Sequence, residues 1–211
     1  MYKKGGKRAF DLILAGLALV TLAPIFGVIG LLVRVKLGSP VLFRQQRPGL
    51  HGRPFTIYKF RTMSDDQDAQ GNLLPDTDRL PSFGKFLRIT SLDELPELWN
   101  VFQGEMSLVG PRPLLLRYTP YFSDEERERF LVRPGITGLA QVSGRNDLNW
   151  DARLAADVRY VQQCSLRLDL RILFTTLWRV LSREGLQVDP GSVMLDLDVE
   201  RRLRLKPEPS R

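Results

Sequence analysis

Cysteine and histidine are almost absent, because the 211-residue chain has only one of each. The single cysteine, Cys164, can form neither a disulfide within the chain nor a thiolate metal site, which fits a reducing, cytosolic setting. We expect it to be a small buried side chain. The single histidine, His51, lies in a turn-like stretch, and we expect it to be solvated. A histidine zinc site or a Ser-His-Asp triad is therefore disfavoured, and a general base is expected to be a carboxylate.

Acidic residues are fewer than basic ones, 24 against 31, which gives a formal net charge of +7. This excess favours an anionic partner, which could be nucleic acid, anionic lipid or a phosphorylated substrate. The length suits one domain of ordinary size, with room for an appendage.

Charge is missing altogether from residues 12–33, a run of 22 residues. A straight helix of this length would cross a bilayer core of about 30 Å. Pro24 removes the backbone hydrogen bond to Val20, which predicts a kink near the middle of the run. The Thr21 hydroxyl could then satisfy a carbonyl that the kink leaves free.

Basic residues flank this run on both sides, and the positive-inside rule favours keeping both ends in the cytoplasm. They are Lys3, Lys4, Lys7 and Arg8 before the run, and Arg34 and Lys36 after it. A helix that enters the membrane, breaks at Ala23-Pro24 and returns would satisfy both observations, while a single-pass anchor fits the pattern equally well. Asp11, at the edge of the run, is expected to pair with Arg8 or Lys7.

The rest of the chain predicts a small β-hairpin and several short helices. Strands are predicted over residues 41–46 and 55–60, and a polar surface loop over residues 63–79. The predicted helices cover residues 81–89, 91–102, 114–121, 150–163 and 168–181. Ser123 and Glu126 match the capping box of a further helix. Residues 133–138 are expected to form a loop, and the tail from Val199 is expected to be charged and poorly ordered.

The apolar face of the predicted helix over residues 168–181 has two interpretations. The face consists of Ile172, Leu173, Leu177, Val180 and Leu181, with arginines elsewhere on the helix. This pattern suits a helix that lies at a membrane interface, and it suits packing against a protein core equally well.

Two adjacent carboxylates, Asp93 and Glu94, stand near the start of the helix predicted from residue 91. Ser91 and Glu94 match a capping box, and Asp93 in a first turn is favoured by the helix dipole, so capping alone can explain the pair. Pro96 costs helix hydrogen bonding just past the first turn and can move both acids out of a regular position.

A catalytic interpretation of the same acids is also open. A carboxylate can attack phosphorus and form an acyl-phosphate intermediate. Mg²⁺ bridging carboxylate and phosphate oxygens would offset the repulsion from the substrate, and arginines would hold the remaining phosphate oxygens. The chain offers basic side chains for such a phosphate cradle near turns and after a strand: Lys59, Arg61, Arg88, Arg112 and Arg145.

Five ordered stretches add a more specific signal. They are KRAFD at 7–11, YKFRTM at 58–63, SLDELPELWN at 91–100, SLVGPRP at 107–113 and RPGITGLAQVSGR at 133–145. Together they resemble the monotopic phosphoglycosyl transferases, the bacterial sugar transferase family that starts capsule, O-antigen, exopolysaccharide and glycoprotein glycans. The resemblance covers roughly residues 1–185, and it favours catalysis over capping for the two acids. The chain is similar to a minimal catalytic core of the family.

The resemblance implies an enzyme that transfers a phosphosugar from a UDP-sugar to polyprenol (undecaprenyl) phosphate and releases UMP, by a ping-pong mechanism with Mg²⁺. Asp93 matches the nucleophile and lies at the metal, and Glu94 would act as a base toward polyprenol phosphate. Arg88 and Arg145 match positions suited to phosphate. Arg112 lies in the Pro-Arg-Pro turn, where a scaffold role is equally open.

The resemblance also implies a re-entrant first helix, although this chain has Ala23-Pro24 where many members have Ser-Pro. The expected fold is α+β and mostly helical. A re-entrant membrane helix would cover residues 1–36, a cytosolic catalytic domain with a β-hairpin and interfacial amphipathic helices residues 37–190, and a charged tail residues 191–211. The expected location is the cytosolic face of the bacterial inner membrane, against anionic lipid, with no nucleic-acid partner and with a homodimer left open.

Two alternatives remain on the sequence alone. A membrane-anchored basic protein that binds anionic lipid would account for the charge of +7, but not for residues 91–97. A transferase with direct attack by polyprenol phosphate would use Asp93 only to hold the metal. Neither residues 64–80 nor residues 185–195 select the sugar.

Overall fold

The computed structural model describes residues 2, 5–144, 149–182 and 195–205. The helices are α1 (Gly6–Thr21), α2 (Ala23–Leu37), α3 (Asp76–Arg79), α4 (Ser82–Ile89), α5 (Glu97–Gln103), α6 (Asp124–Arg127), α7 (Leu139–Ser143), α8 (Trp150–Gln163), α9 (Leu166–Ser182) and α10 (Leu197–Leu205). The strands are β1 (Leu42–Pro48), β2 (Pro54–Phe60), β3 (Ser107–Val109) and β4 (Gly135–Thr137). Short 3₁₀ turns are η2 (Leu50–Gly52), η3 (Leu92–Glu94), η4 (Leu116–Tyr121) and η5 (Glu128–Leu131).

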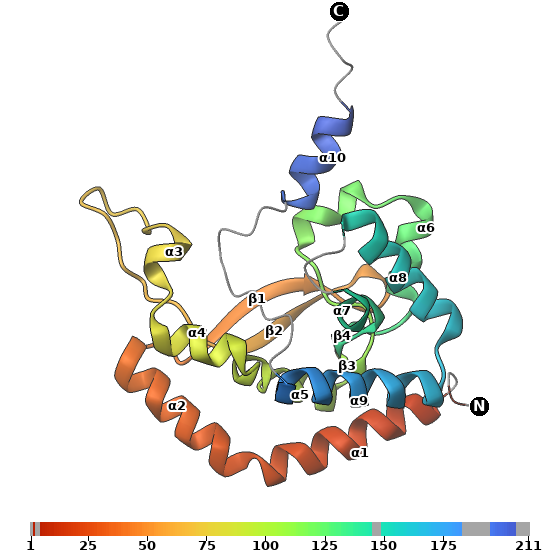
Figure 1. The fold of residues 1–211 in the computed structure, drawn as a ribbon, viewed down its shortest axis with the longest axis horizontal. Coiled ribbons are helices and arrows are strands. Elements are labelled where there is room, and N and C mark those ends of the chain that lie inside the picture. The colour runs from red at the N-terminus through yellow and green to blue at the C-terminus, as the bar shows by residue number, and fades with distance from the viewer. Residues whose placement is uncertain (1, 3–4, 145–148, 183–194, 206–211) are drawn as a thin grey trace, which may run out of the picture.

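The helices surround a central β-hairpin (Figure 1). Helices α1 and α2 follow one another along one side of the molecule, with α9 beside α1. Helices α6, α8 and α10 lie across the hairpin from α1 and α2. The predicted mostly helical fold with a small hairpin is confirmed, whereas the proposed division into three parts stays a prediction.

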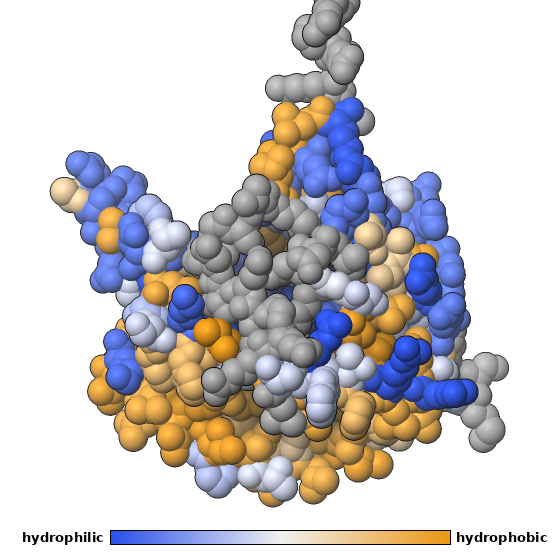
Figure 2. Space-filling view, viewed as in Figure 1, coloured by the Kyte–Doolittle hydropathy of each residue, from blue (hydrophilic) through white to orange (hydrophobic). Residues whose placement is uncertain are grey.

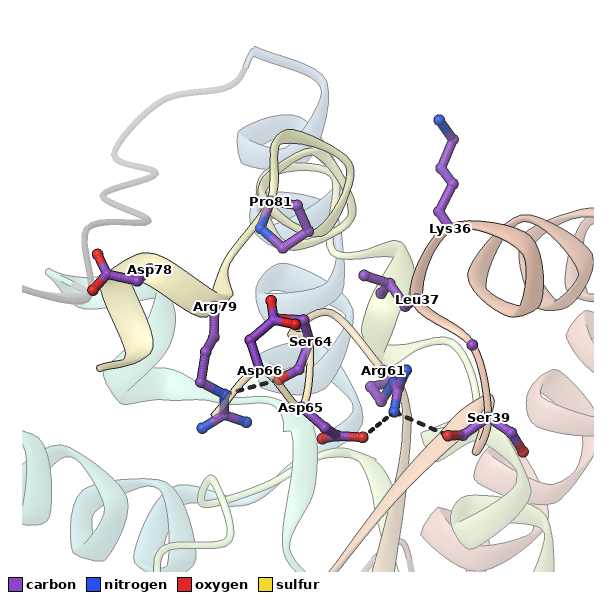
Figure 3. A pocket seen from close by; sticks show the side chains of 11 residues that line it. Lys36, Leu37, Ser39, Arg61, Ser64, Asp65, Asp66, Asp78, Arg79 and Pro81 are labelled. Atoms are coloured by element: carbon purple, nitrogen blue, oxygen red, sulfur yellow. Dashed lines mark hydrogen bonds and ion pairs between the residues drawn. The ribbon is translucent and has the colours of Figure 1, made fainter. Parts of the chain in front are cut away.

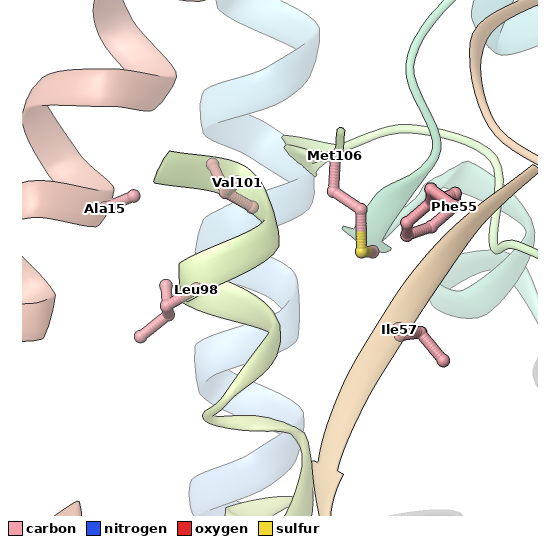
Figure 4. Packing of buried hydrophobic residues seen from close by; sticks show 6 residues of the cluster. All are labelled: Ala15, Phe55, Ile57, Leu98, Val101 and Met106. Carbon is pink, nitrogen blue, oxygen red and sulfur yellow. The ribbon is translucent and has the colours of Figure 1, made fainter. Parts of the chain in front are cut away.

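The hairpin pairs β1 with β2 in antiparallel register, from Leu42 opposite Phe60 to Pro48 opposite Pro54. Phe55 and Ile57 alternate along β2 and are both buried, because successive side chains of a strand point to opposite faces. These two side chains form one buried cluster with Ala15 of α1, with Leu98 and Val101 of α5, and with Met106 (Figure 4). This cluster fixes α5, and with it the acidic turn before α5, against the hairpin.

The first helix is fastened to the domain by its charged end. Arg8 donates to the backbone carbonyls of Val101 and Phe102, at 2.6 and 2.8 Å. Lys7 pairs with Asp169 of α9 at 2.6 Å. Asp11 is buried, accepts a hydrogen bond from the Leu108 N–H at 3.1 Å and lies 3.9 Å from Lys7. The predicted pairing of Asp11 with Lys7 is confirmed, and these contacts join α1 to α5, β3 and α9.

The apolar run is broken between α1 and α2, with a bend of 63°. Pro24 lies in the first turn of α2, where its missing N–H costs nothing to the helix that it starts. The Thr21 hydroxyl donates to the Leu17 carbonyl at 2.9 Å, one turn before the break, rather than to Val20. Within the described residues, neither helix could cross a bilayer by itself, whereas the bent pair is long and apolar enough for a broken span or a re-entrant loop.

A second sheet was not predicted. Strand β3 pairs in parallel with β4, which lies in the segment expected to be a loop. The two strands approach so closely that a Cβ atom built on Gly135 would lie 2.0 Å from the Gly110 backbone nitrogen. The expectation of a loop at residues 133–138 is therefore wrong. Glycine allows the two backbones to approach this closely, and the short sequence by itself does not reveal that contact.

The C-terminal helices agree only in part with the sequence. Helix α8 spans the predicted residues. In α9, Ile172 of the predicted apolar face is buried in the core whereas Leu177 is exposed, so core packing is confirmed for part of that face and a role at a membrane interface stays a prediction. The expectation of a poorly ordered tail from Val199 is wrong for residues 199–205, which belong to α10. Leu197 is buried beside Tyr118, which supplies an apolar contact that the charged sequence does not suggest.

Three smaller expectations are confirmed. Cys164 is buried, and His51 is exposed in the hairpin turn. The capping box of Ser123 and Glu126 forms at the start of α6.

Gly84→Ala is predicted to destabilise the protein by roughly 2 kcal/mol or more, since a Cβ at this position would lie 1.8 Å from the Thr62 carbonyl oxygen. Gly27→Ala is the matched control, because no atom lies within 4 Å of its Cβ position and alanine favours a helix. Thermal unfolding in detergent micelles measures both changes. Equal unfolding temperatures for the two variants would contradict the close approach of α4 to Thr62.

Candidate active site

The two adjacent acids lie in the 3₁₀ turn η3, not in a regular helix. Ser91 has a φ of +54° and its side chain caps nothing, so the predicted cap and the helix from residue 91 are wrong. The regular helix α5 starts only after Pro96. Proline has no N–H to continue a helix from the preceding turn, which explains the break. Asp93 and Glu94 therefore sit on a short, unusual turn, where strained backbone is often associated with function.

A cavity of about 1250 Å³ lies beside this turn. The hairpin, the turn at residues 111–113, α7, α8 and α9 contribute to its lining. Among the described lining residues, eight are Arg or Lys and five are Asp or Glu, so the lining is net positive. Another wall is apolar and includes Leu22, at the break between α1 and α2, with Leu173 and Leu177 of α9. This lining suits a ligand, or a pair of ligands, with both an anionic and an apolar part.

Glu94 is held by two cations. Lys59 Nζ and Arg112 Nη2 each donate to Glu94 Oε1 at 2.6 Å, and the Glu94 side chain is only 18% exposed. Burial by itself would raise the pKa of Glu94, but Arg112 and Lys59 together hold this pKa well below its usual range. Glu94 is therefore a firmly ionised, weakly basic carboxylate as long as both cations stay in place.

Asp93 differs from its neighbour. Its carboxylate makes no hydrogen bond or ion pair with any residue that the structure describes, although it lines the same cavity. Burial, followed by the negative charge of Glu94, raises the pKa of Asp93 to about 6. A carboxylate of this kind gains from a positive ligand and is free to contact one.

The residues around Asp93 fit Mg²⁺ in a limited way. Within the described ranges, no group of three or more His, Cys, Asp or Glu side chains is placed to hold a metal. Mg²⁺ commonly takes one or two carboxylates and completes its shell with water and substrate phosphate oxygens. The unpaired Asp93 carboxylate meets that requirement, and the substrate would have to supply other ligands.

The predicted basic residues are not all at the same place. Lys59 and Arg112 contact Glu94, and Arg88 lines the cavity while its Nε donates to Thr62 Oγ1 at 3.0 Å. Arg61 also lines the cavity, but its hydrogen-bond partners among the described residues are Asp65 and Ser39 rather than Asp93 or Glu94. Arg145 lies outside the described residues.

Arg61 points into a second, smaller pocket of about 510 Å³ between the end of α2 and the loop before α3 (Figure 3). Its Nη1 donates to Asp65 Oδ2 at 2.5 Å and to the Ser39 carbonyl at 3.2 Å. Arg79 donates to the Ser64 carbonyl nearby. Arg61 is thus ion-paired on the rim of the main cavity, whereas Lys59 and Arg112 lie at the acidic turn.

One buried acid of the site, Glu97, was missed by the sequence analysis. Its side chain is 2% exposed, and Oε1 lies 3.0 Å from Lys59 Nζ. Burial, then the charge of Glu94, raises the pKa of Glu97 to about 7. Pro96 separates Glu94 and Glu97 into different elements, so only their common contact with Lys59 identifies Glu97 as part of the site.

The comparisons with known proteins agree with this site. The sequence model for "Bacterial sugar transferase" matches residues 2–183. The chain therefore belongs to the bacterial sugar transferase family, and it is an enzyme of the sugar-phosphate transferase class.

Three relatives show how far the similarity extends. An uncharacterized sugar transferase, EpsL of Bacillus subtilis (strain 168), is 51% identical over 181 residues, which cover 86% of this chain and 90% of that protein. The undecaprenyl-phosphate galactose phosphotransferase of Salmonella typhimurium is 39% identical over 85% of this chain, but the match spans only 41% of that longer protein. A UDP-glucose:undecaprenyl-phosphate glucose-1-phosphate transferase of Caulobacter vibrioides is 39% identical over 85% of this chain and 71% of its own length.

Glu97→Gln is predicted to stabilise the protein more at pH 8 than at pH 5. Folding raises the pKa of Glu97 from 4.5 to about 7, so ionisation costs stability as the pH rises through this window. Glutamine does not ionise and avoids this loss, which amounts to roughly 3 kcal/mol at pH 8. Chemical unfolding at both pH values measures the gap between variant and wild type. A gap that does not change with pH would show that Glu97 is already ionised in the folded protein at pH 5.

Proposed function

We propose that the protein transfers a phosphosugar from a UDP-sugar to polyprenol (undecaprenyl) phosphate and releases UMP, as the first membrane step of a bacterial glycoconjugate. The printed names of two relatives support a UDP-sugar donor and an undecaprenyl phosphate acceptor. The observation that carries the proposal is the Asp93 carboxylate, unpaired among the described residues, next to a Glu94 held by two cations, in a cationic cavity with an apolar wall.

Asp93 is the proposed nucleophile. Its carboxylate oxygen attacks the phosphorus that bears the sugar, and the bond from this phosphorus to the bridging oxygen breaks. The electron pair of that bond leaves on the nucleotide phosphate, which gives UMP and a phosphosugar on Asp93. Attack of a polyprenol phosphate oxygen on the same phosphorus then breaks the bond to Asp93 and returns the electron pair to the carboxylate.

Mg²⁺ is the proposed cofactor, with Asp93 as the residue that would hold it. When bound, it would neutralise phosphate charge next to the carboxylate. Arg88 would contact phosphate oxygens from the same side of the cavity, since its charge already acts on Asp93. Arg145 is proposed for the same role on the strength of the family resemblance.

The proposed base role of Glu94 needs a rearrangement of charge. Both cations bind Oε1, whereas Oε2 makes no hydrogen bond with the described part of the chain. Glu94 can accept a proton only when Lys59 or Arg112 turns toward an incoming phosphate, because the pKa of Glu94 then rises toward its ordinary value. Substrate binding and activation of the base are thereby linked through the same two cations.

The membrane placement is also a proposal. Figure 2 shows hydrophobic residues gathered along the side that α1 and α2 form. The most exposed of them are Ile13, Leu17, Val20, Val28, Leu31 and Val35. Phe174 and Trp178 of α9 add aromatic side chains that are 71% and 61% exposed. We propose that α1 and α2 form a re-entrant helix pair in the inner leaflet, with α9 at the interface and the cavity on the cytosolic face.

Direct attack by polyprenol phosphate on the UDP-sugar is the competing mechanism. In that case Asp93 would only hold the metal, and the protein would carry no phosphosugar at any stage. The unpaired state of Asp93 within the described residues fits both routes, since a metal ligand and a nucleophile both need a free carboxylate oxygen. A phosphosugar on the protein would therefore be the observation that separates them.

Asp93→Asn is predicted to reduce UMP release from UDP-sugars by at least 1000-fold, because an amide cannot form the acyl-phosphate bond. The assay uses a panel of UDP-sugars with Mg²⁺ and undecaprenyl phosphate, which also identifies the preferred sugar. Asp68→Asn, in the exposed loop before α3, is the matched control. Incubation of wild type with donor alone should leave a phosphosugar on the protein, detected by mass spectrometry. UMP release without such an adduct would favour direct attack.

Pro24→Ala is predicted to straighten the break between α1 and α2 and to expose the start of α1 to the periplasm. A cysteine at Gly6 reports this by labelling of intact cells with a membrane-impermeant maleimide, and the native Cys164 is buried. A cysteine at Gln70 is the control for the cytosolic side. The cysteine at Gly6 should be protected in the wild type and labelled in the variant. Protection in both would show that Pro24 is not what turns the chain.

A further inference from the structure

Two arginines without a role in the reaction so far, Arg47 and Arg153, line the main cavity with Arg112. Arg47 stands near the end of β1, and its Nη1 donates to the Pro113 carbonyl at 3.3 Å. Arg153 is in the first turns of α8, with its guanidinium 5.5 Å from the ring centroid of Trp150. Strand β1 and helix α8 therefore bring two separate guanidinium groups to the turn that carries Arg112.

The backbone of this turn is held firmly. Arg129 Nη2 donates to the Arg112 carbonyl at 2.6 Å and to Asp157 Oδ2 at 2.8 Å. Arg129 and Asp157 are both buried, and Asp157 lies one helical turn after Arg153 on α8. The buried ion pair thus locks the Arg112 turn onto the helix that carries Arg153.

The carboxylates near the three arginines are shared with other cations. Glu94 is bonded to Lys59 and Arg112, and Asp157 is bonded to Arg129. Burial, followed by repulsion from Arg112, lowers the pKa of Arg47 to about 10, and the same two causes lower the pKa of Arg153.

Arg47 in particular has only neutral hydrogen-bond acceptors within the described residues. Its Nη2 donates to Gln45 Oε1 at 2.5 Å, and its Nη1 to the Pro113 carbonyl. Its Nε is buried and makes no hydrogen bond with the described residues. A buried donor without an acceptor destabilises a folded protein. An anion in the cavity would supply both the acceptor and the missing negative charge.

We propose that Arg47, Arg112 and Arg153 form a second anion subsite, which binds the nucleotide phosphate of the donor and then the phosphate of the departing UMP. This assignment rests on the proposed function and adds the residues that receive the leaving group. When the bond between the two donor phosphates breaks, the electron pair stays on the nucleotide phosphate and its negative charge increases. Guanidinium groups that are already in place stabilise this charge without reorganisation.

The position of the subsite favours the nucleotide over the lipid phosphate. Trp150, beside Arg153, packs with Tyr118, Phe122 and Leu197, near the start of α10. Helices α8 and α10 lie across the hairpin from α1 and α2, whereas the apolar cavity wall comes from α1 and α9 (Figure 1). A water-soluble nucleotide reaches the α8 side directly, and a polyprenol chain approaches along the apolar wall.

The test measures UMP binding by isothermal titration calorimetry, with the full chain in detergent micelles and Mg²⁺ present. Arg47→Gln and Arg153→Gln should each weaken UMP binding roughly tenfold, since each removes a charge-assisted contact to phosphate. Uridine, which lacks the phosphate, should bind the variants as it binds the wild type. The KM for undecaprenyl phosphate should change by less than about twofold.

Matched controls come from the same two elements. Arg44→Gln changes an exposed arginine of β1 that stacks on Tyr58, and Arg159→Gln changes an exposed arginine of α8. Neither residue lines the cavity, so UMP binding should stay unchanged in both. Arg47→Lys and Arg153→Lys keep the charge and should recover part of the lost affinity, which separates a phosphate contact from a folding defect.

Three results would overturn the assignment. Wild-type UMP affinity in both glutamine variants would show that no phosphate binds at these arginines. A raised KM for undecaprenyl phosphate with unchanged UMP affinity would give the subsite to the lipid phosphate instead. A wild-type protein that neither binds nor releases UMP would contradict the proposed function as well, and the wild-type measurement alone distinguishes that case.

Discussion

The ion pairs of Glu94 with Lys59 and Arg112 are the interaction on which the site depends. They join three segments far apart in the sequence: β2, the 3₁₀ turn η3 and the turn at residues 111–113. A poorly exposed carboxylate needs such partners, because removing one of them would leave a charge that water reaches only in part. The same pairs create the difference between the two neighbours, since they engage Glu94 and leave the Asp93 carboxylate without a hydrogen bond or ion pair among the described residues. When their environments give two adjacent acids different pKa values, the two acids commonly have different chemical roles.

A second constraint fixes the cavity next to the apolar side of the molecule. Arg8 and Lys7 attach α1 to α5 and α9, so Leu22 and the apolar residues of α9 line the same cavity as Asp93. The two proposed substrates have opposite solubility, and this arrangement lets them meet. In the proposed reaction, the lipid acceptor would approach along the apolar wall, and the nucleotide donor would contact arginines on the α8 side. The order of binding that a ping-pong reaction requires is compatible with one cavity that has two such sides.

The sequence predicted the elements whose signals are local. The hairpin has two β-rich runs around a glycine turn, α8 has a continuous helical pattern, and α6 has its capping box, and all three form. The predicted helix from residue 91 failed because Pro96 and the positive φ of Ser91 outweigh the capping pattern. The short strand β4 was missed because a parallel pair depends on a partner that lies far away in the chain. Glu97, Arg47 and Arg153 were missed for the same reason, since each is recognised by its neighbours rather than by a motif.

The sequence by itself determined which residue types are available for the chemistry, which family the chain belongs to, and that Pro24 interrupts the apolar run. These follow from covalent properties and short-range patterns: a proline without an N–H, adjacent carboxylates, and basic residues at both ends of an uncharged run. Only the tertiary structure decided which cation pairs with which acid, that Arg61 pairs with Asp65, and that Asp93, unlike Glu94, makes no ion pair within the part of the chain that the structure describes. The physical reason is that charge interactions depend on distance and burial, and both are set by how distant segments pack together.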